Sequence, residues 1–172
     1  MTAHVLDRND SGTAHRVAHF KHAAGRWASG VAIITTIDVA GRPFGLTMSS
    51  VASLSIDPLR YLICVDRNSN TLAPMLESRV FCVNFLGAEQ GALAMRFARK
   101  SGDKFEGVTW SAAPNRCPIM TGAIACISCE ICAVHDGGDH DIVVGSVVDV
   151  ITADGEPLLY YRGSLCDLRH RS

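Results

Sequence analysis

The longest β-like stretch of the chain consists of two apolar, β-branched runs joined by a short polar loop. The runs are AIACISCEICAV (123–134) and IVVGSVVDVI (142–151), and the loop between them is HDGGDHD (135–141). Gly137 and Gly138 supply the positive φ that a tight turn between two strands needs. We therefore expect a long antiparallel hairpin around which the rest of the chain must build its sheet.

Short β-like runs separated by turn residues make up most of the remaining chain. Five such runs lie at 31–38, 43–55, 60–66, 80–86 and 157–163. Apolar residues at helical spacing predict only three helices, at 14–30, 71–78 and 88–100. Many short strands with few helices favour a mainly β fold, in which an antiparallel sheet closes into a barrel.

The length and charge of the chain exclude several classes of protein. Its 172 residues fit one domain, and the formal net charge is −1. This balance argues against nucleic-acid binding and against attachment to a membrane by basic residues, because both need a field of one sign. No stretch approaches the roughly 18 uninterrupted apolar residues of a membrane span. We expect a flexible N-terminal tail (1–13) without a signal peptide and a single cytoplasmic domain (14–172).

Seven cysteines, an odd number, indicate reduced thiols rather than a disulfide framework. Cys126, Cys129 and Cys132 are spaced like the ligands of zinc or of an iron–sulfur cluster. In a strand, however, Cys126 and Cys132 share one face about 20 Å apart, and Cys129 points to the other face. Metal–sulfur bonds are only about 2.3 Å long. We therefore expect small, buried apolar thiols and no metal here.

Familiar enzyme signatures are missing from the sequence. It has no glycine-rich dinucleotide or phosphate loop, no nucleophile elbow and no H-E-x-x-H zinc motif. Any chemistry must therefore be carried by something other than a familiar nucleophile or phosphate loop.

Two polar segments interrupt the predicted strands. The first, GLTMSS (45–50), is either an edge strand with a solvated face or a surface whose small hydroxyl residues let a flat ligand lie against the backbone. The second, RNSNT (67–71), leads into the second predicted helix, where Ser69 or Asn70 would be a good N-cap. Free N–H groups and spare hydroxyls there could also bind a phosphate. Two cations could add positive charge to the same anion: Arg96 and Lys104.

Several motifs, taken in order, resemble those of one family. They are TMSS, SNT, FCVNFL, DKFEGVTW, GAIACISCE, DGGDH and PLLYYRG, between about Gly30 and Leu168. The chain resembles the short-chain flavin reductases, which have an antiparallel Greek-key split barrel that binds FMN, with a few flanking helices. Members often serve as the reductase component of two-component flavin-dependent monooxygenases. The sequence departs from the family pattern at Val51, at Leu59 and Arg60, and in a C-terminus that stops soon after YYRG.

The resemblance implies a role for each matching residue. The isoalloxazine and ribityl chain of FMN or FAD would contact Pro43, Gly45, Leu46, Thr47, Ser49 and Ser50, with backbone contacts from Cys64, Val65 and Asp66. Phosphate would be held by Ser69, Asn70 and Thr71, with Arg96, Phe97 and Lys104 nearby. The nicotinamide dinucleotide would contact Gly138, Asp139 and His140, and Tyr161 would lie beside the pocket. Asn84 would be structural or near the flavin.

The polar loop HDGGDHD has three readings. A metal site would use His135, Asp136, Asp139, His140 and Asp141. That spacing lacks the regular acidic positions of an EF-hand, and Val147 stands where its closing Glu belongs. The second reading is a bare hairpin. We favour the third, in which the turn carries His140 to the rim of the flavin pocket, where its imidazole binds and orients the hydride donor.

Together the residues and the resemblance predict an NAD(P)H:flavin oxidoreductase in which His140 is the catalytic residue. Hydride transfer needs no protein nucleophile, because the cofactors carry the chemistry. NADH is favoured over NADPH, because no arginine cluster indicates a 2′-phosphate site. Reduced flavin would diffuse to a separate monooxygenase.

Two alternatives to this function stay open. One is a non-catalytic flavin carrier, and the other is a reductase that keeps FMN bound and passes electrons to another acceptor. Because barrels of the family pair, we also expect a homodimer, without nucleic-acid or membrane partners.

Overall fold

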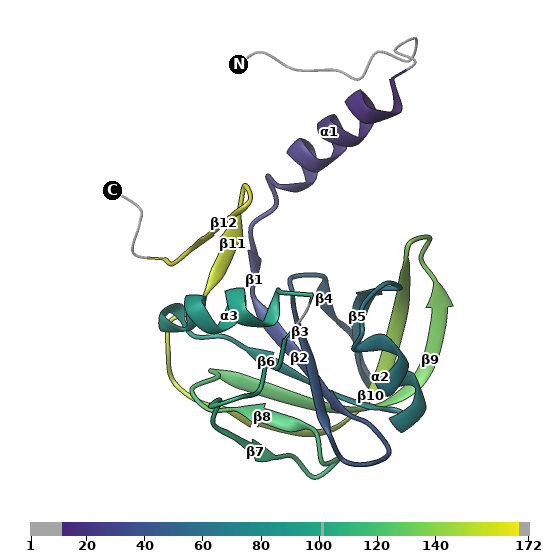
Figure 1. The fold of residues 1–172 in the computed structure, drawn as a ribbon, viewed down its shortest axis with the longest axis vertical. Helices are drawn as coiled ribbons and strands as arrows, with labels where there is room; N and C mark the ends of the chain where they lie inside the picture. Colours follow the sequence, from purple (N-terminus) through teal and green to yellow (C-terminus); the bar gives the residue numbers. More distant parts are fainter. Residues whose placement is uncertain (1–11, 101, 169–172) are drawn as a thin grey trace.

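A seven-stranded antiparallel sheet forms the centre of the computed structural model, which describes residues 12–100 and 102–168 (Figure 1). The strands lie in the order β3 (Pro43–Met48), β2 (Ala32–Ile37), β6 (Val80–Phe85), β9 (Ala125–Asp136), β10 (His140–Thr152), β5 (Leu59–Asp66) and β4 (Val51–Ile56). The mainly β, antiparallel fold that the sequence predicts is therefore confirmed.

The two edge strands of this sheet, β3 and β4, are consecutive in the sequence. Only Ser49 and Ser50 separate Met48 at the end of β3 from Val51 at the start of β4. The three chain steps between Met48 and Val51 span at most about 11 Å, so the two edges must meet and the sheet curls into a barrel. Met48 and Val51 accordingly pack in one apolar cluster with residues of the strands between them, among them Ile34, Phe81 and Val143.

The long hairpin expected from the sequence is β9–β10, and Gly138 at its turn has φ +84°, a value that glycine adopts at little cost. β10 pairs with β9 on one side and with β5 on the other, so the hairpin lies inside the sheet. A register shift interrupts its ladder next to Gly145. A Cβ atom at Gly145 would lie 2.6 Å from Cys129 Cβ and 2.7 Å from the Phe81 ring, so this position has room for glycine only.

Within the described residues, two small sheets and three helices accompany the barrel. β1 (Ser29–Gly30), β11 (Leu159–Tyr161) and β12 (Ser164–Cys166) form one sheet, and β7 (Trp110–Ala112) pairs with β8 (Pro118–Met120). The helices are α1 (Thr13–Ala24), α2 (Leu72–Ser78) and α3 (Gly91–Phe97), the last preceded by the 3-10 turn η1 (Ala88–Gln90). Buried side chains of α2 and α3 pack these two helices onto the barrel, namely Leu72, Met75, Ala94 and Phe97.

The structure differs from the sequence prediction in several places. The run at 43–55 is two strands rather than one, because the chain crosses there from one edge of the sheet to the other. The helix expected at 14–30 ends at Ala24, because Ser29 and Gly30 pair with β11. Strands β7, β8 and β12 have three residues each, too few for an alternating pattern to reveal them.

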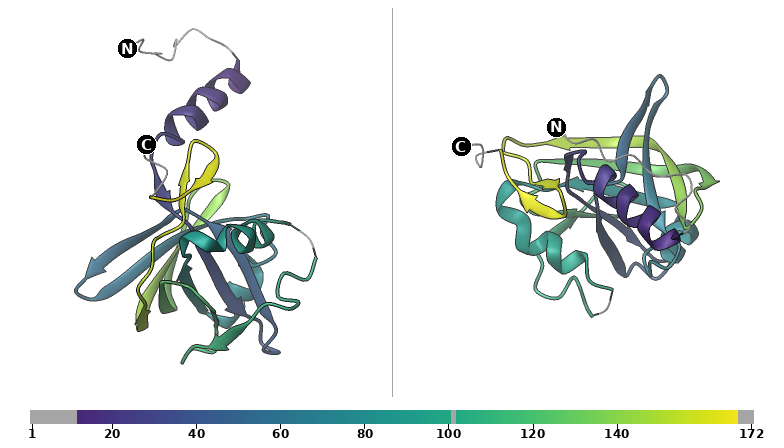
Figure 2. Two further views of the ribbon diagram at one scale, coloured as in Figure 1. Left: turned by 90° about the vertical axis from the view of Figure 1, so that its left-hand side faces the viewer. Right: turned by 90° about the horizontal axis from the view of Figure 1, so that it is seen from above.

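The first helix, α1, projects from the barrel without covering it, as Figure 1 and the left view of Figure 2 show. None of its residues is buried, and the Phe20 side chain is 69% exposed. Residues 1–11 of the predicted tail lie outside the described residues, and its last residue, Thr13, already belongs to α1. No helix in the described ranges is both long enough and apolar enough to cross a membrane.

Candidate functional site

Three adjoining cavities run past the β3–β4 connection. A cavity of about 210 Å³, here called the polar cavity, shares Thr47 and Ala98 with a cavity of about 400 Å³, here called the apolar cavity. The apolar cavity shares Ser49, Tyr160 and Gly163 with an outer cavity of about 750 Å³. Because neighbouring cavities share walls, an elongated ligand could extend from one into the next.

Polar groups at the start of α2 line the polar cavity. β5 ends at Asp66, and the chain turns through Asn68, Ser69 and Asn70, all of which lie in the cavity wall. The N-cap of α2 is Thr71 rather than Ser69 or Asn70, and Ser69 Oγ instead accepts a hydrogen bond from the Thr71 N–H (3.2 Å). Within the described part of the chain, the buried Thr71 hydroxyl has no hydrogen-bond partner, which is rare in folded proteins.

Three cationic side chains line the same cavity: Arg99, Lys100 and Lys104. Lys104 Nζ donates to the carbonyl oxygens of Gly45 (2.9 Å) and Phe97 (3.1 Å), and burial lowers the pKa of this ammonium group. The buried Phe97 ring also lies in the wall. Sequence reasoning singled out Lys104 but missed Arg99 and Lys100, and the basic end of the 88–100 helix is the signal that could have found them.

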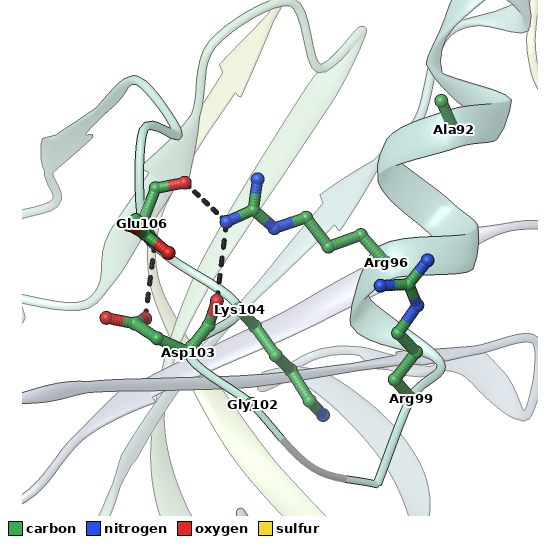
Figure 3. A pocket seen from close by; sticks show the side chains of 7 residues that line it. All are labelled: Ala92, Arg96, Arg99, Gly102, Asp103, Lys104 and Glu106. Carbon is green, nitrogen blue, oxygen red and sulfur yellow. Dashed lines mark hydrogen bonds between the residues drawn. The ribbon is translucent and has the colours of Figure 1, made fainter.

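Arg96 does not line the polar cavity and holds a loop instead (Figure 3). Its Nη2 atom donates to the backbone oxygen of Glu106 and to that of Asp103, the latter at 3.3 Å. Arg96 also lines a cavity of about 520 Å³, which shares Arg99 and Lys104 with the polar cavity. The structure thus gives Arg96 a loop-anchoring contact, and its part in phosphate binding stays a prediction.

The β3 residues expected to contact flavin line two different cavities. Leu46 and Thr47 lie in the wall of the polar cavity, whereas Pro43 and Gly45 line a neighbouring cavity of about 190 Å³. Thr47 Oγ1 donates to the backbone oxygen of Ala94 in α3 (2.6 Å). This hydroxyl therefore already fastens α3 to the barrel, and it positions the wall that the two cavities share.

The apolar cavity is lined by Ser49 together with residues of α3, β3 and β11. Met95 of α3 is 59% exposed there, and Tyr160 of β11 stands in the same wall. Tyr161, expected beside the pocket, is not among the lining residues, and its ring lies 5.2 Å from the Arg162 guanidinium carbon. Successive residues of a strand face opposite ways, so only one of the two tyrosines can face this cavity.

Most of the backbone groups expected to contact flavin from β5 are used within the sheet. The Cys64 N–H donates to the Ser50 carbonyl (3.0 Å), and the Ser50 hydroxyl donates to the Cys64 carbonyl (3.3 Å). Val65 is fully buried and pairs with β10. Asp66 does line the polar cavity, and hydrogen bonds from the Asn68 backbone and side chain lower the pKa of its carboxyl group.

Asn84, expected to be structural or near the flavin, has a structural role. It is fully buried, and its Nδ2 donates to the Ile33 carbonyl (3.0 Å) and to Thr35 Oγ1 (3.1 Å). Its Oδ1 accepts a hydrogen bond from the Met120 N–H (2.8 Å). Asn84 thereby ties β8 to β2 and β6.

The polar loop of the β9–β10 hairpin is held by Arg67, the residue that follows β5. The Arg67 guanidinium donates to Asp141 Oδ1 (2.7 Å), to Asp136 Oδ1 (2.6 Å) and to the Gly138 carbonyl (2.8 Å). Its backbone N–H donates to the Asp139 carbonyl (3.1 Å). Two of the three loop aspartates thus pair with a cation of the protein itself. Among residues 12–100 and 102–168, no three His, Cys, Asp or Glu side chains are grouped closely enough to hold a metal ion.

The third loop aspartate, Asp139, accepts a hydrogen bond at 2.7 Å from Nδ1 of His140. His140 pairs with Asp66 across β10 and β5, and Asp66 lines the polar cavity. His140 itself is not among the lining residues, but its half-exposed imidazole stands one strand away from the cavity wall. Its Nε2 atom forms no hydrogen bond within the described residues.

Cys126, Cys129 and Cys132 differ in burial. Cys126 and Cys129 are buried in different apolar clusters, as expected for a strand that faces two sides. Burial raises the pKa of the Cys129 thiol to about 12. Cys132 is exposed, contrary to the expectation of buried thiols, because it lies at the register shift beside Gly145 where the ladder skips a residue.

The fold and the cavities together define a class of protein, a split barrel whose cavities suit an elongated ligand with an anionic and an aromatic end. Hydroxyl, amide and cationic groups line the polar cavity. The apolar cavity next to it is lined mainly by apolar side chains, together with Tyr160 and the hydroxyls of Thr47 and Ser49. Such a division suits a phosphate at one end and a flat ring at the other.

The chain belongs to the flavin reductase like domain family, whose profile matches residues 24–169. It is 42% identical over 145 residues to the reductase subunit of a flavin-dependent monooxygenase from Rhodococcus jostii, covering 84% of this chain and 74% of that protein. It is also similar to the crystal structure of nitrilotriacetate monooxygenase component B from Mycobacterium thermoresistibile (TM-score 0.88, 35% identity, 92% and 89% of the two chains). An NADH:FAD oxidoreductase from Streptomyces globisporus, in complex with NAD and FAD fragments, has a TM-score of 0.87 at 28% identity over 99% of each chain.

The predicted activity is therefore confirmed at the level of the family: the chain is an NAD(P)H-dependent flavin reductase of the kind that supplies reduced flavin to a monooxygenase component. The residues present fit a flavin. Arg99, Lys100 and Lys104 suit its phosphate, and the unpaired Thr71 hydroxyl lies next to the Asn70 of the cavity wall. The methionines and the tyrosine of the apolar cavity suit a flat ring.

Proposed function

We propose that FMN or FAD lies along the polar and apolar cavities, with its phosphate beside Ser69 and Asn70 and its ring beside Thr47 and Ser49. The cations of the polar cavity favour the phosphate at that end. Thr47 belongs to both cavities, so the ligand passes it between its two ends. Bound flavin supplies a ring that accepts hydride, and the chain binds and orients the two reactants.

We also propose that His140 binds the nicotinamide dinucleotide at the edge of the polar cavity. The observation that carries this proposal is that Thr47 and Asp66 line one cavity while Asp66 pairs with His140. Asp139 holds Nδ1, which leaves Nε2 to meet a polar group of the dinucleotide. A hydrogen bond at that position orients the nicotinamide, which is the hydride donor, against the flavin ring. The two reactants are then held in an arrangement from which hydride transfer can occur.

The kinetic test compares His140→Ala with His135→Ala, an exposed histidine of the same hairpin. NADH oxidation is followed with added FMN or FAD, after the visible spectrum of the protein has been recorded. We expect His140→Ala to raise KM for NADH about tenfold, the effect of losing one hydrogen bond, and to leave KM for flavin unchanged. Equal effects on both substrates, or an equal effect of His135→Ala, would argue against the role of His140.

The same measurement tests how flavin is used. If flavin is a diffusible substrate, the purified protein is nearly colourless and NADH is consumed only after flavin is added. A strongly yellow protein that ignores added flavin would contradict a diffusible substrate.

We further propose that the protein is a homodimer. Large apolar side chains stay exposed on the two strands that flank β5, namely Leu54 and Ile56 of β4 and Val148 and Val150 of β10. Exposed apolar side chains gathered on neighbouring parts of a sheet favour a protein interface, and a second copy of the chain would cover them. Light scattering should give twice the chain mass, and Ile56→Lys should lower it. A monomeric mass for the unmodified protein at every concentration would refute the dimer.

We place the protein in the cytoplasm. All seven of its cysteines are free, including three whose side chains are accessible or partly accessible: Cys64, Cys132 and Cys166. Reduced thiols are the usual state of cysteine in that compartment. Fractionation of the native host, with the protein detected by antibody, tests this placement, and recovery outside the cytoplasm would contradict it.

A further inference from the structure

We infer that Arg67 is a positioning residue, which clamps the tip of the β9–β10 hairpin to the end of β5 and thereby holds His140 in place. This inference rests on the proposed function of His140. Arg67 does not line the described cavities, so it acts through the hairpin rather than by touching flavin.

The Arg67 guanidinium joins three separate parts of the hairpin tip. Nη2 donates to Asp136, the last residue of β9, and Nη1 donates to the carbonyl of Gly138 in the turn. Nε donates to Asp141, near the start of β10. The planar fork of an arginine can point donors in three directions at once, which the single ammonium group of a lysine cannot do in the same geometry.

Arg67 contacts both neighbours of His140, one through its backbone and the other through its guanidinium. The Arg67 N–H donates to the Asp139 carbonyl, which continues the β5–β10 ladder one step beyond the Asp66–His140 pair. Asp141, on the other side of His140, is held by the guanidinium. Arg67 therefore holds the main chain directly before His140 and the side chain directly after it.

The turn needs such a clamp because it contains two adjacent glycines. Gly137 and Gly138 have no side chain to restrict their backbone, and Gly138 already has φ +84°. Two further hydrogen bonds close the turn: the Gly137 N–H donates to the His140 carbonyl (2.9 Å), and the Gly138 N–H donates to Asp136 Oδ1 (3.2 Å). That Gly138 bond and the Arg67 guanidinium both lower the pKa of the Asp136 carboxyl.

The clamp contributes more to orientation than to stability. The Arg67 side chain is 45% exposed, that of Asp136 is 77% exposed and that of Asp141 is 16% exposed. Because the guanidinium that both carboxylates share reaches solvent, the two ion pairs add little to the free energy of folding. Removal of Arg67 should therefore leave the barrel folded while the hairpin tip becomes free to move.

The kinetic experiment uses Arg67→Gln and Arg67→Lys, with Arg60→Gln as the matched control. Arg60 lies in β5, opposite Ser146, seven residues before Arg67 and therefore about 23 Å away. We expect both Arg67 variants to raise KM for NADH about three- to tenfold, with KM for flavin and kcat within about twofold of the unmodified enzyme. Arg60→Gln should change none of these values. In a His140→Ala background, Arg67→Gln should have no further effect on KM for NADH.

A second measurement does not depend on activity. Hydrogen exchange of the Gly137 and Gly138 amides in the flavin-free protein should be faster in Arg67→Gln and unchanged in Arg60→Gln, because the clamp no longer limits opening of the turn.

Two outcomes would overturn the inference. Unchanged exchange would show that Arg67 does not restrain the tip. A rise in KM for NADH that persists in the His140→Ala background would show that Arg67 acts on the dinucleotide directly. Failure of the proposed function is seen separately, as an unmodified enzyme without flavin-dependent NADH oxidation or as a His140→Ala variant with unchanged KM.

Discussion

Replacement of the buried Asn84 by leucine should destabilise the protein without changing its kinetics. Leucine has the same branching and a similar size, so Asn84→Leu opens no large cavity. It does leave the Met120 N–H without its acceptor, at a cost of about 1–3 kcal/mol for a buried group. The bonds from Nδ2 to Ile33 and Thr35 add only about 0.5 kcal/mol each, because the Thr35 hydroxyl keeps its bond to the Pro118 carbonyl and Ile33 stays paired within the sheet. We expect a total loss of about 2–4 kcal/mol.

Urea unfolding followed by far-ultraviolet circular dichroism, at one fixed protein concentration, measures this loss. It corresponds to a fall in Tm of about 5–15 °C for a chain of this size. Steady-state kinetics at a temperature where the variant stays folded should give unchanged KM values for NADH and flavin. A variant of unchanged stability with a raised KM for flavin would refute the reasoning, because it would place Asn84 at the ligand rather than in the core.

Two further predictions follow from the packing and from the ion pairs. Gly145→Ala should cost about 1–3 kcal/mol of unfolding free energy, because its Cβ would lie 2.7 Å from the Phe81 ring, whereas Gly30→Ala has nothing within 4 Å and should cost less than about 0.5 kcal/mol. Equal urea midpoints for the two variants would contradict this. The Asp38 carboxyl accepts hydrogen bonds from the Arg42 N–H (2.8 Å) and side chain (2.6 Å), which lower its pKa. Its folded pKa is thus below its unfolded pKa, so its stabilisation is fully present above the unfolded pKa of about 3.9 and is lost as the pH falls from there through the lower folded pKa. The urea midpoints of Asp38→Asn and the unmodified protein should therefore differ at pH 7, and the difference should shrink as the pH falls below about 3.9. A difference that grows on acidification would contradict the expected direction of the pKa shift.

The parts of the fold that the sequence predicts are those with a local pattern. The β9–β10 hairpin is recognisable because two β-branched runs meet at Gly137–Gly138, and α2 and α3 are recognisable from their apolar spacing. Residue pattern alone does not reveal that β3 and β4 lie at opposite edges of the sheet. That arrangement depends on pairing between strands far apart in sequence, such as β6 with β9.

Prediction of the site has a similar limit. Thr47, Ser69, Asn70 and Lys104 are expected at the flavin and do line one cavity. Whether Tyr160 or Tyr161 lines the cavity depends on which face of the three-residue strand β11 points toward it. Because the residues of β11 are apolar or aromatic on both faces, the sequence does not show this orientation. The hydrogen-bond acceptors of Arg67 are equally hard to predict from the sequence, because they lie about 70 residues further along the chain.

The Ser49–Ser50 link closes the barrel and also lines the apolar and outer cavities. A ligand in contact with Ser49 therefore touches the connection that joins the two edge strands of the sheet. A bound ligand should therefore reduce the motion of this connection, so that binding and release change the rigidity of the closed barrel.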